Sequence, residues 1–167
     1  MTNIKGTTAS KLEYTGIVTV SQCTHSKKIT LAKLHNEGGK SLFNYLADCL
    51  VGDFDIANAS RPTKIMLLNV DDSGKIEKAN NASFIYILYN PEKVYDDSKG
   101  IVRYSFIIPQ DVLSGSSFNA IGLYAANATE ADLADFAACC RFELDRSNIS
   151  LSHILVIDWE LHIFNST

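Results

Sequence analysis

The segment from residue 154 to residue 163 constrains the fold more than any other part of the chain. Its apolar and polar side chains alternate, and such a period of two is typical of a β-strand with one buried face, because successive side chains of a strand point to opposite faces. We therefore predict a half-buried strand here, with Trp159 facing inward. The apolar positions are Leu155, Ile157, Trp159, Leu161 and Ile163, and the polar ones are Asp158, Glu160 and His162.

Other segments predict further strands. Residues 136–144 alternate as well, with Cys139 and Cys140 on opposite faces, and a turn-rich stretch at 145–148 separates them from the last strand, so we predict an antiparallel pair. In 119–125, Gly122 is expected to mark a bulge or a close backbone approach. The remaining predicted strands are 14–22 and 28–34, expected as an opening hairpin, 64–70 and 84–89, expected to be buried on both sides, and 102–108.

One segment has the period of a helix instead. Apolar residues recur at helical spacing from Leu42 to Leu50, between Gly38-Gly39 and Gly52. We predict a short packed helix around 40–51 with Gly52 as its left-handed cap, and a weaker helical turn at 129–135 with Thr129 as N-cap. The fold class is therefore mostly β, an antiparallel β-sandwich (or barrel-like arrangement) with one short helix, and residues 1–167 form a single domain.

Charge and composition restrict the classes of partner. The formal net charge is -4, and the basic residues are scattered along the chain, which argues against nucleic acid and against a membrane surface as partners. No apolar stretch has the length of a membrane span or of a secretory signal. The cysteines, which lack a disulfide or zinc spacing, favour synthesis in a reducing compartment. Residues 1–11 form a polar arm that either docks on a neighbouring subunit or is disordered.

The histidines and cysteines lack the spacing of a catalytic or metal site. His25, His35, His153 and His162 are isolated from Cys and carboxylate partners at ligand spacing. His162 is expected to be exposed, and His35 to shape a turn through its side chain rather than act in catalysis. The four cysteines, Cys23, Cys49, Cys139 and Cys140, contain no CxxC pair and are interpreted as buried, unpaired thiols.

Acidic and glycine-rich motifs also have simpler interpretations. The pairs Asp53/Asp55, Asp71/Asp72 and Asp96/Asp97 are interpreted as solvated loop carboxylates, because none has the spacing of a calcium loop. Gly38-Gly39-Lys40-Ser41 resembles the end of a phosphate-binding loop, but Leu34 stands where its first glycine belongs. We therefore expect no catalytic, cofactor-binding or metal-binding residues.

The tyrosines leave one alternative open. Tyr86, Tyr89, Tyr95, Tyr104 and Tyr124 would form a sugar-binding platform if several were exposed together, whereas most are expected to face the core.

Two segments resemble a known class of proteins. Asn119-Ala120-Ile121-Gly122-Leu123-Tyr124, then Leu133-Ala134-Asp135-Phe136-Ala137, then Leu155-Val156-Ile157-Asp158-Trp159-Glu160-Leu161 resemble bacteriophage tail, collar and fibre-attachment modules. Residues 34–52, with His35-Asn36 before Leu42-Phe43, are similar to virion proteins of the same kind.

The resemblance implies a non-enzymatic virion structural protein in the tail, collar or fibre-attachment apparatus, made in the host cytoplasm. Its partners would be other copies of itself, as a homo-oligomer, and other virion proteins. Two alternatives remain: a carbohydrate-binding, receptor-recognition β-sandwich module that contacts a glycan, and a small hydrolase that uses His35 with a loop carboxylate.

Overall fold

The computed structural model describes residues 11–24, 26–52, 54–80, 82–86, 92–96, 99–108, 113, 118–141 and 154–166. Residues 1–10 of the predicted arm lie outside this part. Strands dominate the described residues, and two helices interrupt them. The strands are β1 (Lys11–Cys23), β2 (Lys28–Gly38), β3 (Pro62–Val70), β4 (Ile76–Lys78), β5 (Ile85–Tyr86), β6 (Glu92–Asp96), β7 (Lys99–Ile108), β8 (Ala120–Ala125), β9 (Ala138–Arg141) and β10 (Ile154–Ser166), and the helices are α1 (Lys40–Val51) and α2 (Phe54–Ser60).

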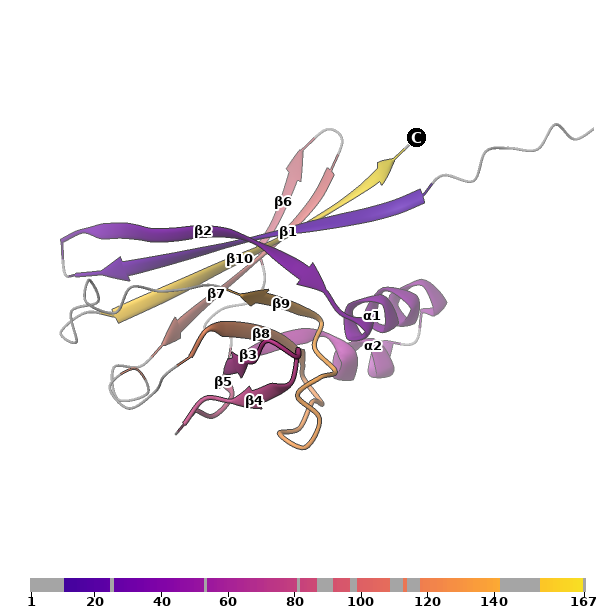
Figure 1. The fold of residues 1–167 in the computed structure, drawn as a ribbon. Coiled ribbons are helices and arrows are strands. Elements are labelled where there is room, and N and C mark those ends of the chain that lie inside the picture. The colour runs from indigo at the N-terminus through magenta and orange to yellow at the C-terminus, as the bar shows by residue number, and fades with distance from the viewer. Residues whose placement is uncertain are drawn as a thin grey trace, which may run out of the picture.

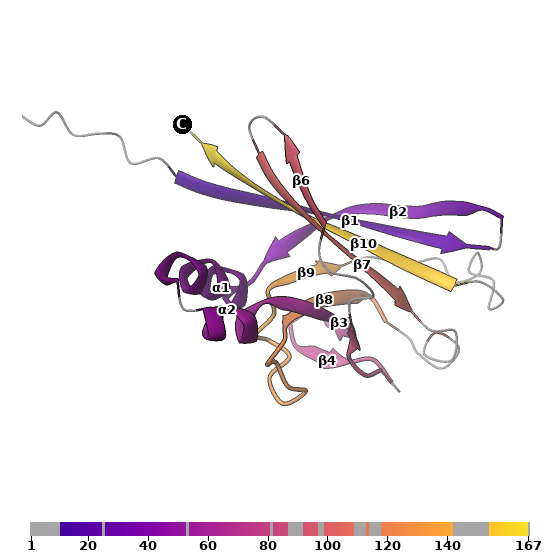
Figure 2. The same cartoon turned by 180° about the vertical axis from the view of Figure 1, so that it is seen from behind.

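The described strands form one continuous antiparallel sheet. Nine of them follow the order β4-β3-β8-β9-β2-β1-β10-β7-β6, and β5 also pairs with β3. Strand β2 joins two layers, because Lys28 to Asn36 pair with β1 whereas Glu37 and Gly38 pair with β9. The layer of β1, β2, β6, β7 and β10 lies over that of β3, β4, β8 and β9 (Figures 1 and 2). The mostly-β prediction with a short helix is confirmed, but the sheet does not close into a barrel.

The core fills the space between the two layers. Trp159 and Phe106 from one layer and Leu67 and Leu123 from the other are fully buried in the same apolar cluster. The predicted alternation of the last strand is therefore confirmed, with Trp159 inward. Strands β3 and β8 are buried along nearly their whole lengths, because the loop after β8 covers their outer face, where the Tyr124 hydroxyl donates to the Leu133 carbonyl at 2.8 Å.

Strand pairing differs from the sequence prediction at one point. The opening hairpin is confirmed as β1 and β2. The predicted pairing of 136–144 with the last strand is wrong, because β9 pairs with β2 and β8 whereas β10 pairs with β1 and β7. Strand β9 also lacks the predicted alternation, since Ala138, Cys139 and Cys140 are all buried. A short turn favours pairing between the two strands that it connects. Strand β9 instead lies between β2 and β8, where both of its faces are buried.

The structure confirms the prediction for Gly52 and one of the two predictions for Gly122. Gly52 ends α1 with φ 80° and donates its N–H to the Asp48 carbonyl, as predicted. Gly122 does not mark a bulge in the pairing of β3 with β8, whose register shift falls between Pro62 and Lys64. A Cβ at Gly122 would lie 2.5 Å from the Tyr124 ring, so a close approach of this side chain requires the glycine.

Candidate functional site

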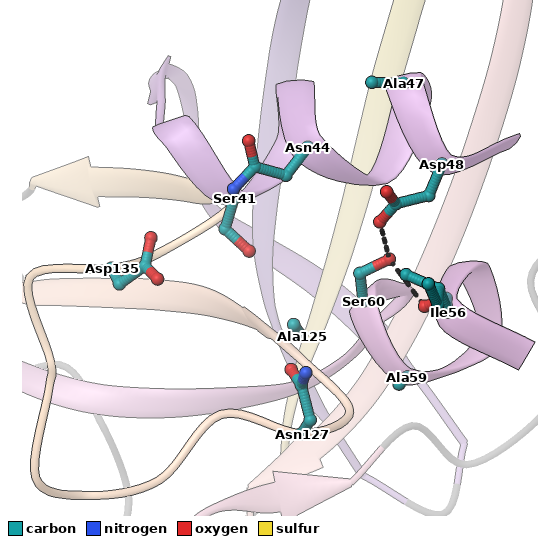
Figure 3. Close-up of a pocket in the computed structure, with 10 residues that line it drawn as sticks. All are labelled: Ser41, Asn44, Ala47, Asp48, Ile56, Ala59, Ser60, Ala125, Asn127 and Asp135. Atoms are coloured by element: carbon teal, nitrogen blue, oxygen red, sulfur yellow. Dashed lines mark hydrogen bonds between the residues drawn. The ribbon is translucent and has the colours of Figure 1, made fainter. Parts of the chain in front are cut away.

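Helices α1 and α2 lie at one end of the layer formed by β3, β4, β8 and β9, which we call the lower layer (Figure 1). Together with one loop, these helices line a cleft (Figure 3). Helix α1 begins after Gly39, whose N–H donates to the Ala137 carbonyl at 2.8 Å, and Leu42 is buried in the core. Helix α2, which the sequence analysis did not predict, packs against α1. The third wall is the loop after β8, from 126 to 135. The predicted helical turn at 129–135 is wrong, because this segment contains turns only.

The cleft has a volume of about 510 Å³, and a smaller cavity of about 240 Å³ adjoins it along the loop. We call it the polar cleft, because hydroxyl, amide and carboxylate groups line much of it. These groups belong to Ser41, Asn44, Asp48, Ser60, Asn127 and Asp135.

The hydrogen bonds inside the polar cleft involve only some of its groups. The Ser60 hydroxyl lies 2.8 Å from Asp48 Oδ2 and 3.0 Å from the Ile56 carbonyl (Figure 3), and its single proton can be donated to one of them at a time. Ser41, in the first turn of α1, lines the cleft and is only 7% exposed as a residue.

A buried lysine holds the loop in place. Lys64 is 4% exposed, and its Nζ donates to the carbonyls of Ala126 at 3.0 Å and Ala128 at 2.6 Å. The ammonium also lies 4.2 Å from the centre of the Phe84 ring, where a cation is attracted to the π-electrons. Burial lowers the pKa of Lys64. The two hydrogen bonds from Lys64 therefore fix the loop that carries Asn127 and Asp135.

Next to the cleft, the two helices expose apolar side chains. Phe43 and Ile56 are each 53% exposed, Leu50 is 86% exposed and Val51 is 82% exposed. We call these four residues the helical patch. Phe43 and Leu50 lie two turns apart on the same face of α1, since seven residues correspond to nearly two full turns. Large exposed apolar surfaces bordered by polar residues mark sites of protein interaction.

The histidines and carboxylates singled out in the sequence lie elsewhere. His162 is near Glu160, at 3.2 Å, and only 16% of its side chain is exposed, less than expected. His35 is exposed within β2 and forms no side-chain hydrogen bond in the described part of the chain, so the turn-shaping prediction is wrong.

The loop carboxylates behave as expected where they are described. Asp71 accepts hydrogen bonds from Ser73 and Lys75 in an exposed turn. Asp72 and Asp55 are exposed too, whereas His25, His153, Asp53, Asp97 and the side chain of Asp96 lie outside the described residues.

The cysteines and tyrosines divide by burial. All four cysteines are free, but only Cys139 and Cys140 are buried, so the prediction of buried thiols is wrong for the exposed Cys49 and for the half-buried Cys23. Tyr104 and Tyr124 are core residues as predicted, whereas Tyr86 is 64% exposed. Tyr89 and the side chain of Tyr95 lie outside the described residues.

Sequence reasoning missed the polar cleft. Its walls come from segments more than 60 residues apart, and no spacing rule connects Asp48 with Asn127 or Asp135. Within the described residues, no group of three or more His, Cys, Asp or Glu side chains could hold a metal ion, and neither described helix has the length and hydropathy of a membrane span. Comparisons with protein families, curated proteins and solved structures find no match to this chain.

Proposed function

We propose that this protein is a non-enzymatic structural component of a phage-like particle, in the tail, collar or fibre-attachment apparatus. It acts by self-association and by contact with other virion proteins. The observation that carries the proposal is the helical patch, where four large apolar side chains are more than half exposed. Burying apolar surface contributes roughly 25 cal/mol per Å², so contact with a neighbouring subunit through this patch would be favourable.

The shape of the molecule supports the same proposal. The ends of β1 and β10 lie side by side and extend beyond the body of the fold (Figure 1), with Lys11 paired with Ser166. The helical patch lies on the α1–α2 pair at one end of the lower layer. Separate contact surfaces on one small subunit are what a ring or an axial stack requires. The resemblance of the 119–124 and 155–161 segments to tail and collar modules is what directs the proposal to a phage-like particle.

The test is the mass of the purified protein across a concentration series, by light scattering coupled to size exclusion, with negative-stain images of the largest species. We expect a discrete symmetric oligomer, and Leu50→Glu should reduce its mass because the charge cannot be buried at the contact. Ile29→Glu is the matched control, since Ile29 is 42% exposed on β2, away from the helices, and its substitution should leave the mass unchanged. A strict monomer at every concentration would contradict self-association.

The carbohydrate-binding module remains the competing function. It requires several aromatic rings on one surface, but of the tyrosines considered for this role, Tyr104 and Tyr124 are buried and Tyr86 is exposed. Binding of the monomer to an immobilised glycan panel would favour that function over assembly.

A further inference from the structure

Strand β1 has an open edge along residues 11–15. The strand pairs with β10 over its whole length, but its pairing with β2 begins only at Gly16, which stands opposite Asn36. After Asn36, β2 turns toward α1 and pairs with β9 through Glu37 and Gly38 (Figures 1 and 2). Within the described part of the chain, the main-chain groups of residues 11–15 that point away from β10 therefore have no strand beside them.

An aromatic pair separates β2 from this edge. If the register of β1 and β2 continued, Gly38 would stand opposite Tyr14. Instead, the Tyr14 side chain spans the gap, because a Cβ on Gly38 would overlap its hydroxyl group. The Tyr14 ring also packs edge-to-face against Phe43 of α1, with the ring centroids 5.7 Å apart. Side-chain packing therefore maintains the separation of β2 from the open edge and holds α1 beside it.

An open strand edge is a template for another strand. Its free N–H and C=O groups can extend the ladder of hydrogen bonds by one further strand. The opposite side of β1 is already fixed, since its pairing with β10 extends as far as Lys11 and Ser166. Phe43, which is 53% exposed, adds apolar surface next to the edge. The edge therefore has both the main-chain groups and the apolar border that strand addition uses.

We propose that the open edge of β1 pairs with the same edge of a second copy of this chain. Two identical edges that meet antiparallel about a twofold axis provide each other with hydrogen-bond partners, so one contact covers both. The sheet then runs through the two subunits without a break. This inference rests on the proposed function, in which the subunit self-associates, and it specifies one of the contacts.

The charges of the edge select the register of this pairing. Residues 11–15 contain one basic and one acidic residue, Lys11 and Glu13. In an antiparallel pairing centred on Leu12, Lys11 of each copy stands opposite Glu13 of the other, and residues that stand opposite each other have their side chains on the same face. A pairing centred on Glu13 would place two like charges opposite each other, which is unfavourable. Charge complementarity therefore favours the register centred on Leu12.

The same register joins the edge to the helical patch. Leu12 stands opposite Leu12 of the other copy, and residues two apart in a strand share a face, so this apolar pair lies on the face of Tyr14. On that face Tyr14 contacts Phe43, a member of the helical patch. Tyr14 itself stands opposite residue 10 of the other copy, so the end of the polar arm completes the ladder. Apolar contact therefore continues from the ladder to the helices.

The test is the dissociation constant of the dimer, measured by sedimentation equilibrium of the full chain in the Leu50→Glu background, where contact through the helical patch is removed. Lys11→Glu or Glu13→Lys creates two like-charge pairs across the twofold axis, and each should weaken dimerisation roughly tenfold or more. The double variant Lys11→Glu/Glu13→Lys should restore the original constant, because its pairs are reversed rather than lost. Lys75→Glu and Glu77→Lys are the matched controls, since they reverse the same charges at an exposed ion pair by β4, and should leave dimerisation unchanged.

Amide hydrogen exchange locates the contact. Alternate amides of residues 11–15 point away from β10, and these should exchange more slowly at protein concentrations above the dissociation constant than below it. In Lys11→Glu the same amides should exchange equally fast at the higher and the lower concentration. Exchange at these amides that does not depend on dimer formation would overturn edge pairing.

The oligomeric states separate this inference from the proposed function. A Leu50→Glu protein that is a monomer at every concentration would overturn edge pairing, and so would a dimer that neither single charge reversal weakens or that the double variant does not restore. A wild-type protein that forms the same dimer as Leu50→Glu at every concentration would refute assembly through the helical patch and leave edge pairing intact.

Discussion

Arg103 and Glu160 lie opposite each other on β7 and β10, and their side chains form a cross-strand ion pair. Arg103 Nη2 and Nε donate to Glu160 Oε1 at 2.7 and 2.9 Å. On the same face, Asp158 accepts a hydrogen bond from Ser105 at 2.7 Å and pairs with Lys28 at 2.6 Å. These contacts link β7, β10 and β2 on the face of the sheet that is turned away from the core.

The Arg103–Glu160 pair predicts a dependence of stability on pH. Burial alone would raise the pKa of Glu160, but hydrogen bonds from Arg103 and His162 outweigh it, so the pKa is lowered. The ionised pair therefore stabilises the fold above the unfolded pKa of about 4.3, and this contribution is lost as pH falls through the lower folded value. Because the Arg103 side chain is 37% exposed, we expect Glu160→Gln to cost about 1 kcal/mol or less at neutral pH.

Urea denaturation of the wild type and Glu160→Gln from pH 7 to pH 3 measures this difference, which should shrink in acid. Glu77→Gln is the control, since its pair with Lys75 is largely exposed and its removal should have little effect at any pH. A difference that persists unchanged at pH 3 would contradict the interpretation.

The start of α1 should be intolerant of any side chain at Gly39. A Cβ there would lie 1.9 Å from the Phe136 carbonyl oxygen, and the backbone of residue 136 cannot move without disturbing the bond from Gly39 to Ala137. We expect Gly39→Ala to lower the free energy of unfolding by about 2 kcal/mol or more. At Gly100, an added Cβ would lie 4.0 Å from its nearest neighbour, the Ile163 carbonyl oxygen, so Gly100→Ala should change stability little. If chemical denaturation gave the same free energy of unfolding for Gly39→Ala and Gly100→Ala, this packing argument would be refuted.

Lys64 predicts a change of stability on the alkaline side. Burial lowers its pKa in the folded state, whereas an unfolded lysine titrates near pH 10.4. Between the two values the unfolded chain binds more protons, so this residue's contribution makes the fold more stable as pH rises. Lys64→Met removes that contribution and leaves the Ala126 and Ala128 carbonyls without their donor, at a cost of roughly 1–3 kcal/mol.

The measurement is the difference in free energy of unfolding between the wild type and Lys64→Met from pH 7 to pH 10, which should widen as pH rises. Lys33→Met, on an exposed position of β2, controls for the loss of one lysine charge. A constant difference over this range would show that burial does not shift the titration of Lys64.

Thiol reactivity should separate the cysteines by burial. Burial raises the pKa of Cys139 to about 11 and that of Cys140 to about 12, so few thiolates form near neutral pH. Cys49 is exposed on α1. We expect Ellman's reagent to react first at Cys49 in the native protein, and the fastest phase to disappear in Cys49→Ser. Labelling of Cys139 or Cys140 at the rate of Cys49, as seen by mass spectrometry, would contradict the burial of β9.

Local patterns in the sequence predicted several elements well. The alternation around Trp159 identified β10, since a period of two is a property of the strand itself. The run from Leu42 to Leu50 and the position of Gly52 identified α1 and its cap. The same reasoning failed at 129–135, where the hydrogen bond from Tyr124 to Leu133 holds a loop against the outer face of β8 instead of allowing a helical turn.

The sequence by itself determined the strand and helix periods, the inward position of Trp159 and the opening hairpin, because these depend on neighbours within a few residues. Only the tertiary structure decided that β10 pairs with β1 and β7, and that Ser41, Asp48 and Asp135 meet in one cleft. These contacts join segments far apart along the chain. The local pattern allows many strand pairings equally well, and the strand order that buries both faces of β3, β8 and β9 is decided by the packing of the whole chain.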